Sequence, residues 1–135
     1  MHGYLQNGFP ALAVRIIKSA VPVLSDLNAP PVLEKLAMQR SGLILITGPA
    51  GSGKSTTLAA MVDFINRNKS AHIVTLEDPP EYRFTEDKSI ISQRQVGSDT
   101  GSFALGLRAA LRQDPDVIMI GELRDAQTAA GAVSA

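Results

Sequence analysis

Three observations predict an α/β domain built on a mainly parallel sheet. Short apolar runs of strand length recur at residues 43–46, 72–76 and 117–120. Segments with the periodicity of amphipathic helices separate these runs. Each run ends in a glycine-rich or acidic turn, as strands do in alternating β–α units. Because ligands bind beyond the carboxyl ends of parallel strands, we expect the three turns to converge on one site.

Composition indicates one globular domain and narrows the functional classes. The chain has 135 residues, 44% of them hydrophobic, and 13 basic side chains balance 13 acidic ones. This neutrality argues against a nucleic-acid partner unless a local basic patch is hidden in the balance. The absence of cysteine excludes disulfides and thiolate metal sites. No apolar run has the length of a membrane span, and the N-terminus lacks the pattern of a signal peptide, so a cytoplasmic location is expected.

The first predicted elements are a strand and a short helix. Residues 11–17 alternate in the manner of a strand and have proline on both sides. Residues 24–31 read as a linker. Pro31 suits the first turn of a helix with an apolar stripe, and Gly42 ends that helix before the first buried run.

The turn after that run is the strongest functional motif in the chain. It fits the pattern G-x-x-x-x-G-K-[ST] between a predicted strand and a predicted helix. Backbone N–H groups of such a loop cradle phosphate, whereas the alternative is a loop that only turns the chain. The lysine is expected to reach the phosphates of ATP, and Ser55 to hold Mg²⁺. The expected nucleotide-binding residues are Gly48, Pro49, Ala50, Gly51, Ser52, Gly53, Lys54, Ser55 and Thr56.

The second half of the chain continues the alternation. Residues 72–76 predict a second strand and 89–92 a short edge strand, before the third buried run. Ser102 is the expected N-cap of a helix that continues to Arg112. Asp125 is the expected N-cap of a last helix.

Two acidic residues follow strands beside the phosphate loop. Glu77 follows the second apolar run, and Glu122 follows the third, in the position of a Walker B acid. Nucleotide hydrolysis needs a cation and a group that orients water. Glu122 is expected to hold Mg²⁺ together with Ser55 or to polarise the water, and Glu77 to orient it; the alternative for either acid is a solvated loop residue. Asp116 precedes its strand and is expected to be structural.

These motifs together resemble the secretion ATPase family of type II secretion and type IV pili, and most closely its pilus-retraction members. Residues 48–61 resemble the Walker A motif and the helix that follows it. Residues 75–82 resemble the Asp box of the family, and residues 107–125 resemble its Walker B region. Residues 6–17 resemble the last strands of its PAS-like domain.

The resemblance implies a P-loop NTPase with a RecA-like core that is incomplete in this chain. Residues 1–27 would be the end of the PAS-like domain and its linker, and residues 28–135 a partial ATPase domain. The parent protein would be a homo-hexameric, Mg²⁺-dependent ATPase at the cytoplasmic face of the inner membrane, acting on a membrane platform protein. Glu77 and Glu122 would be its catalytic acids, and Arg15 would reach the nucleotide of a neighbouring subunit.

The resemblance also implies a gap in the sheet. In this P-loop class the strand after Walker B lies between the Walker B strand and the P-loop strand, and here it would follow Ala135. We therefore expect residues 43–46 and 117–120 to lie side by side with a gap, or to pair directly. We also expect the chain alone to hydrolyse ATP poorly and not to form the hexamer, because unpaired apolar strands favour aggregation.

Three alternatives stay open. The chain could be a P-loop ATPase of another class, such as a DNA-translocation helper, a nucleotide-binding chain without turnover, or a small-molecule kinase. A basic surface or stacking aromatic residues would favour the first, and the sequence shows neither. A kinase would need an acceptor site and a lid, which the sequence does not reveal. ATPase assays with and without DNA separate the motor from the first two alternatives.

Overall fold

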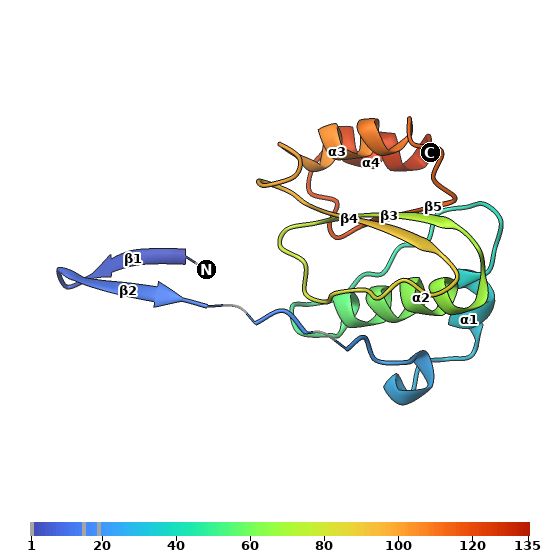
Figure 1. Cartoon of the computed structure of the whole chain (residues 1–135), viewed down its shortest axis with the longest axis horizontal. Helices are drawn as coiled ribbons and strands as arrows, with labels where there is room; N and C mark the ends of the chain where they lie inside the picture. The colour runs from blue at the N-terminus through green and yellow to red at the C-terminus, as the bar shows by residue number, and fades with distance from the viewer. Residues whose placement is uncertain (1, 15, 19) are drawn as a thin grey trace.

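The structure is a computed structural model that describes residues 2–14, 16–18 and 20–135. The chain begins with a strand hairpin, continues through helices, and then mixes strands with helices over its second half (Figure 1). None of the described helices combines the length and the apolar character needed to cross a membrane. In chain order the elements are β1 His2–Gln6, β2 Phe9–Ala13, η1 Leu24–Leu27, α1 Val32–Ala37, α2 Lys54–Asn68, β3 His72–Glu77, β4 Ile90–Gln95, α3 Phe103–Ala110, β5 Val117–Ile120 and α4 Ala126–Val133.

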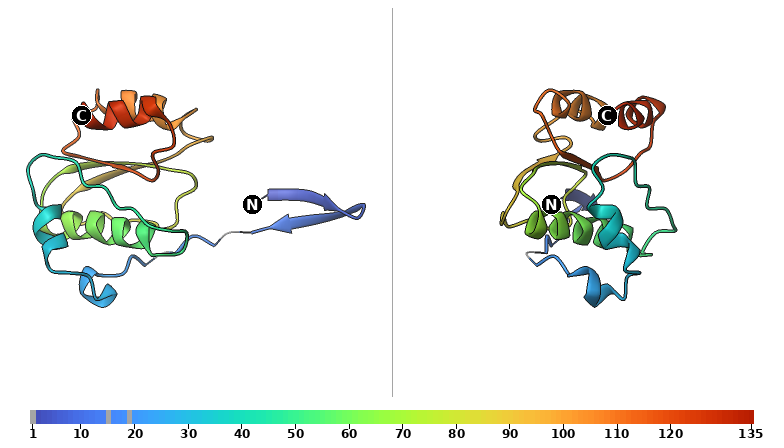
Figure 2. Two further views of the ribbon diagram at one scale, coloured as in Figure 1. Left: turned by 180° about the vertical axis from the view of Figure 1, so that it is seen from behind. Right: turned by 90° about the vertical axis from the view of Figure 1, so that its right-hand side faces the viewer.

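The central sheet has three parallel strands in the order β4–β3–β5. In the middle strand, Thr75 lies opposite Gln93 of β4 and opposite Met119 of β5. Helices α1 and α2 lie on one side of the sheet, and α3 and α4 lie on the other (Figure 1 and Figure 2). This layered arrangement with a parallel sheet is the predicted α/β fold class.

Alternation along β3 builds a separate core on each face of the sheet. Ile73 belongs to the core under α2, together with Met61 of that helix and Met119 of β5. Leu76 belongs to the core under α3, together with Leu107. Burying each such side chain stabilises the fold by about 1.5–3 kcal/mol, so the sheet is fixed from both sides.

Residues 43–46 do not form the predicted strand. No strand ladder includes them among the described residues, and β5 pairs there only with β3. Leu43 and Leu45 are 51% and 61% exposed, whereas Ile46 packs against the core under α2. A strand requires a hydrogen-bonding neighbour, and an apolar run without one stays outside the sheet. The direct pairing with β5, one of the two expected arrangements, is therefore not formed.

The strand predicted at residues 11–17 lies earlier in the chain. β2 spans Phe9–Ala13 and forms an antiparallel hairpin with β1. Asn7 and Gly8 have φ angles of 51° and 81°, as a two-residue hairpin turn requires. Because the turn lies at Asn7 and Gly8, the second strand of the hairpin begins at Phe9, closer to the N-terminus than predicted. The hairpin projects away from the three layers (Figure 1).

The segment predicted to be a linker contains the short helix η1, and α1 ends at Ala37 rather than next to Gly42; the other elements follow the predictions with small shifts. β4 covers Ile90–Gln95 and is thus longer than the edge strand predicted at 89–92. Both predicted caps are confirmed: the side chains of Ser102 and Asp125 accept backbone N–H hydrogen bonds from three residues further on, at 3.2 and 2.7 Å. Helix α3 ends two residues before the predicted end.

Candidate nucleotide-binding site

The glycine-rich loop connects residues 43–46 to helix α2. Gly48, Gly51 and Gly53 have φ angles of 156°, 76° and 89°, which residues with a side chain rarely adopt. At Gly48 a Cβ atom would also lie 2.7 Å from Ser52 Oγ. Gly53 is the N-cap of α2, and the first N–H groups of a helix have no partner within it. The loop and the helix start therefore offer backbone donors suited to a phosphate.

Lys54 is the first residue of α2, and its ammonium group lies on the loop. Its Nζ donates hydrogen bonds to the carbonyl oxygens of Gly48 at 2.9 Å and Pro49 at 2.7 Å. The positive charge is thus held beside the loop and the N-terminus of the helix. An anion at this position would meet the lysine and the positive end of the helix dipole together.

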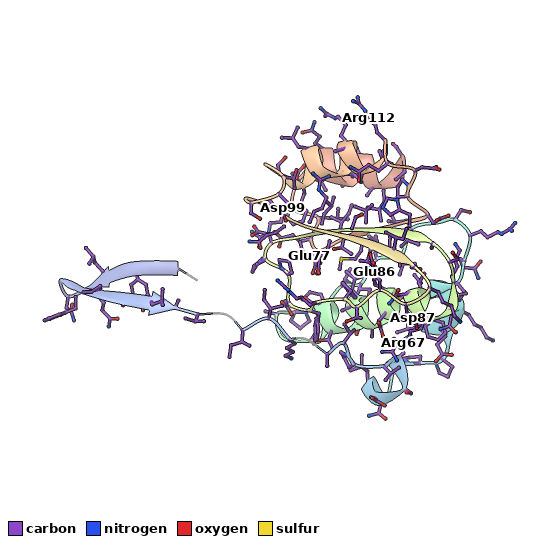
Figure 3. The ribbon with its side chains drawn as sticks, viewed as in Figure 1. Arg67, Glu77, Glu86, Asp87, Asp99 and Arg112 are labelled. Atoms are coloured by element: carbon purple, nitrogen blue, oxygen red, sulfur yellow. The ribbon has the colours of Figure 1, made fainter. Side chains whose placement is uncertain are left out.

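Glu77 is the last residue of β3 and lies in a largely enclosed position. It is 8% exposed, and Figure 3 shows it between the sheet and α2. Its Oε1 atom accepts hydrogen bonds from Thr75 Oγ1 and Gln93 Nε2, each at 2.8 Å. These two donors offset part of the cost of burying a carboxylate.

The turn after β5 brings Glu122 to the same end of the sheet. Gly121 N donates to Leu76 O at 2.8 Å, which attaches this turn to the end of β3. A Cβ atom on Gly121 would lie 3.3 Å from that oxygen, so the close approach favours glycine. The Glu122 carboxylate pairs at 2.9 Å with Arg124, whose side chain is 79% exposed, so solvent screens the pair.

One small cavity, of about 110 Å³, brings three of the predicted site residues together. Ser55 lines it from the first turn of α2, Glu77 from the end of β3, and Glu122 from the turn after β5. The loop that follows β3 and the side of α2 supply most of the remaining walls. Four acidic residues line the cavity, and two of them, Glu77 and Glu122, share this space with the Ser55 hydroxyl next to the glycine-rich loop; the other two are Asp78 and Glu81.

The oxygen donors of this cavity fit Mg²⁺ that is bound together with a phosphate. Mg²⁺ prefers carboxylate, hydroxyl, water and phosphate oxygens. Among the described residues, no group of three or more His, Cys, Asp or Glu side chains could hold a metal ion. A cation near Ser55 and Glu122 would thus depend on phosphate oxygens and water, as it does in P-loop NTPases.

Comparison with known protein families shows to which family the chain belongs. The model of the family described as Type II/IV secretion system protein matches residues 14–135. The chain belongs to this family. Its expected membership among secretion and pilus ATPases is thereby confirmed, and the glycine-rich loop and both acidic turns lie within the matched residues.

Family relatives and a solved structure agree with this assignment. The protein YggR of Escherichia coli strain K12, described as uncharacterized, is 55% identical over 118 residues, which are 87% of this chain and 36% of that protein. The twitching motility protein of Neisseria gonorrhoeae is 50% identical over 126 residues, which are 93% of this chain and 34% of that protein. The crystal structure of the pilus retraction motor PilT with bound ADP has a TM-score of 0.92 at 52% identity, covering 95% of this chain and 37% of that one.

The likeness to PilT confirms the predicted RecA-like α/β fold class. Both the identity and the TM-score are high over nearly the whole of this chain. The chain spans about a third of the length of the relatives that it matches.

Tyr82 connects the P-loop helix of this family member to a segment near the N-terminus. Its hydroxyl lies 3.0 Å from Thr56 Oγ1 in the first turn of α2. Lys18 Nζ lies 5.4 Å from the centroid of the tyrosine ring, and the Lys18 backbone bonds to Glu81 and Arg83. Thr56, an expected nucleotide-binding residue, therefore already shares its hydroxyl with the loop after β3.

The other residues that the sequence singled out have different positions. Residues 49–52 lie on the exposed part of the loop. Arg15 lies outside the described residues. Asp116 Oδ2 accepts a hydrogen bond from His72 N at 2.8 Å, at the opposite end of β3 from the cavity. Arg112 points away from the sheet (Figure 3).

Sequence reasoning missed Thr75 and Gln93, the two side chains that bind Glu77. Thr75 could have been placed there, because residues two apart on a strand share a face. Gln93 could not, because its position depends on the register of β4 beside β3. The contact between Thr75 and Glu77 can therefore be predicted from neighbouring residues in the sequence. The contact between Gln93 and Glu77 can be predicted only when the pairing of two distant strands is known.

Proposed function

We propose that the chain binds ATP or ADP with Mg²⁺ through residues 48–56 and hydrolyses ATP. The observation that carries this proposal is the single cavity lined by Ser55, Glu77 and Glu122 beside the glycine-rich loop. A hydroxyl for the cation, carboxylates for water and backbone donors for phosphate are the parts that phosphoryl transfer to water needs. The ADP bound to PilT, which is 52% identical, supports the choice of nucleotide.

In this proposal the loop N–H groups and Lys54 bind the β- and γ-phosphates. The ammonium group that lies on Gly48 O and Pro49 O turns to phosphate oxygens. Ser55 and Glu122 would hold Mg²⁺, the latter directly or through water, and the cation would supply positive charge beside the phosphates. Glu77 accepts a hydrogen bond from the attacking water and orients it toward the γ-phosphate.

We further propose that the parent protein is a motor subunit of a type IV pilus or type II secretion system. Residues 28–135 would be part of its RecA-like ATPase domain, and residues 1–27 the end of a PAS-like domain with its linker. The subunit would form a homo-hexamer at the cytoplasmic face of the inner membrane, act on a membrane platform protein, and use Arg15 at a neighbouring nucleotide. Family membership and the projecting β1–β2 hairpin support this extension (Figure 1).

Substitution of the two acids tests hydrolysis separately from binding. In the full-length protein, Glu77→Gln and Glu122→Gln are each expected to lower ATP turnover by about a hundredfold or more. The reason is that the orientation of the water and the cation matters most in the transition state. Nucleotide affinity is expected to stay within a few-fold, as the loop is untouched. Turnover is measured with and without DNA, with Glu34→Gln on the exposed side of α1 as the control. Near-normal turnover of either variant would remove that acid from the mechanism.

A further inference from the structure

We propose that Gln93 and Thr75 are positioning residues that fix the Glu77 carboxylate for catalysis. This inference rests on the proposed function of Glu77 and extends it to side chains that do not line the cavity themselves. Both donors bind the same oxygen, Oε1, at 2.8 Å. No hydrogen bond to Oε2 is formed among the described residues, and Oε2 is not among the enclosed unpaired atoms there. One oxygen is thus held by the sheet, while the other is accessible.

The sheet register places all three side chains on one face. Thr75 and Glu77 are two residues apart on β3, and Gln93 is the cross-strand partner of Thr75 on β4. Ile73 lies two residues before Thr75 on β3 and packs under α2. The three polar side chains are therefore on the face of the sheet that α2 covers. Along β3 that face therefore changes from an apolar core at Ile73 to a hydrogen-bonded polar group at the end where the cavity lies.

The Gln93 amide is itself fixed at two points. Its Nε2 atom donates to Glu77 Oε1 and also to Tyr82 O, each at 2.8 Å. The two N–H bonds of one amide group thus join the end of β3 to the loop that follows it. Thr75 is fully buried, so no water competes for its hydroxyl. Glu77 therefore has little freedom to rotate, and pre-organisation of this kind lowers the cost of reaching the reactive geometry.

Charge-assisted hydrogen bonds of this kind each have a measurable effect on rate when they hold a catalytic group. Loss of one such bond is expected to lower kcat by about tenfold to a hundredfold. Nucleotide affinity should stay nearly unchanged when either hydrogen bond is lost, because neither donor lies on the phosphate-binding loop. A separation between kcat and affinity is therefore the signature of positioning.

Removal of the Gln93 amide group tests the proposal. Gln93→Met keeps the length of the side chain and removes both donors, and Gln113→Met is the control, because Gln113 is exposed and lies near the opposite end of β3. In the full-length protein, we expect Gln93→Met to lower kcat about tenfold to a hundredfold, with nucleotide Kd changed by less than about threefold. Gln113→Met should leave both values unchanged. Thr75→Val, which keeps the shape of the threonine, should act in the same direction as Gln93→Met.

A double-mutant cycle separates positioning from a general loss of structure. In the Glu77→Gln background, Gln93→Met is expected to cause little further loss of kcat, because the group it positions is already gone. Equal losses in both backgrounds would overturn the proposal. A crystal structure of the Gln93→Met variant is expected to show the Glu77 carboxylate in more than one orientation, and a single unchanged orientation would also overturn it. If Glu77→Gln loses turnover but Gln93→Met does not, only this inference fails, whereas full turnover of Glu77→Gln removes the proposed role of Glu77 itself.

Discussion

At the scale of single residues, Gly121 sets how closely the two acids approach. The turn after β5 passes so near β3 that a Cβ atom at Gly121 would lie 3.3 Å from Leu76 O and 3.5 Å from Glu77 Cα. Backbone atoms cannot rotate away as the tip of a side chain can. Any substitution must therefore move the end of β3 or the turn that carries Glu122.

We expect Gly121→Ala to lower ATP turnover by about tenfold or more, since a displaced catalytic group loses its alignment with the substrate. Nucleotide affinity should change little, because the glycine-rich loop is unaffected. Gly101→Ala is the control, because its Cβ would lie at an ordinary distance of 3.5 Å from the Leu105 side chain. The measurements are a steady-state ATPase assay and a nucleotide titration. Equal turnover of the two variants would show that the approach of the turn to β3 is not critical.

At the scale of elements, helix α4 is held at its start by Asp125. Oδ1 accepts a hydrogen bond from Thr128 N at 2.7 Å, and Oδ2 accepts one from Thr128 Oγ1 at 2.6 Å. The Thr128 hydroxyl, followed by the Thr128 backbone N–H, lowers the pKa of Asp125 below its ordinary value of 3.8. Thr128 is fully buried, so the cap also attaches the helix to the core.

This lowered pKa predicts how the cap depends on pH. Because the folded-state value lies below the unfolded one, the stabilisation is fully present above the ordinary value of 3.8 and is lost as pH falls through the folded-state pKa. We expect the difference in unfolding free energy between wild type and Asp125→Ala to be constant from neutral pH to about pH 5 and to shrink at lower pH. Asp26→Ala, on the exposed η1 turn, is the control. A difference that stays constant to the lowest pH measured would show that the ionised Asp125 carboxylate does not stabilise the start of α4.

The elements that sequence predicts well are those encoded by neighbouring residues. The caps at Ser102 and Asp125, the glycine loop and the run at 117–120 depend on local patterns, and the structure agrees with each. The run at 43–46 has the same composition as a buried strand but lies outside every ladder of the described residues, because pairing requires a neighbour that local composition does not reveal.

The candidate site likewise contains residues that local sequence patterns predict and residues whose role depends on contacts between distant segments. Glu77 and Glu122 are predicted as candidates because each comes within two residues of the end of an apolar run, and the parallel topology places the ends of those runs together. The role of Gln93 depends on β4 lying in register beside β3, and that of Tyr82 depends on a loop returning to the start of α2. Sequence therefore predicts which groups come from strand ends, but not the contacts that orient them.

At the scale of the whole molecule, the exposed apolar residues 43–45 are expected to favour self-association of the polypeptide. Leu43, Ile44 and Leu45 are 51%, 39% and 61% exposed. Contiguous apolar side chains with unpaired backbone groups favour association with other chains. Any arginine acting between subunits also needs neighbours held in register, which non-specific association does not provide.

We therefore expect the 135-residue polypeptide to self-associate without forming an ordered hexamer, and to hydrolyse ATP poorly. Light scattering after gel filtration measures the mass, and Leu45→Lys is expected to reduce the association, because it places a charge on the apolar surface. Lys18→Met, which removes a charge elsewhere, is the control. A discrete hexamer of the unmodified polypeptide with turnover comparable to that of a full-length relative would contradict this prediction.

Residues 48–56 are proposed to bind the phosphates of ATP, and substitution of Lys54 is the most direct test of this assignment. A fluorescent ATP analogue is titrated into the wild type, into Lys54→Ala, and into Lys69→Ala at the other end of α2 as the control. We predict that Lys54→Ala raises the Kd by about tenfold to a hundredfold, because it removes the charge that faces the phosphates, while Lys69→Ala leaves the Kd unchanged. Unchanged binding by Lys54→Ala would contradict the assignment of the site.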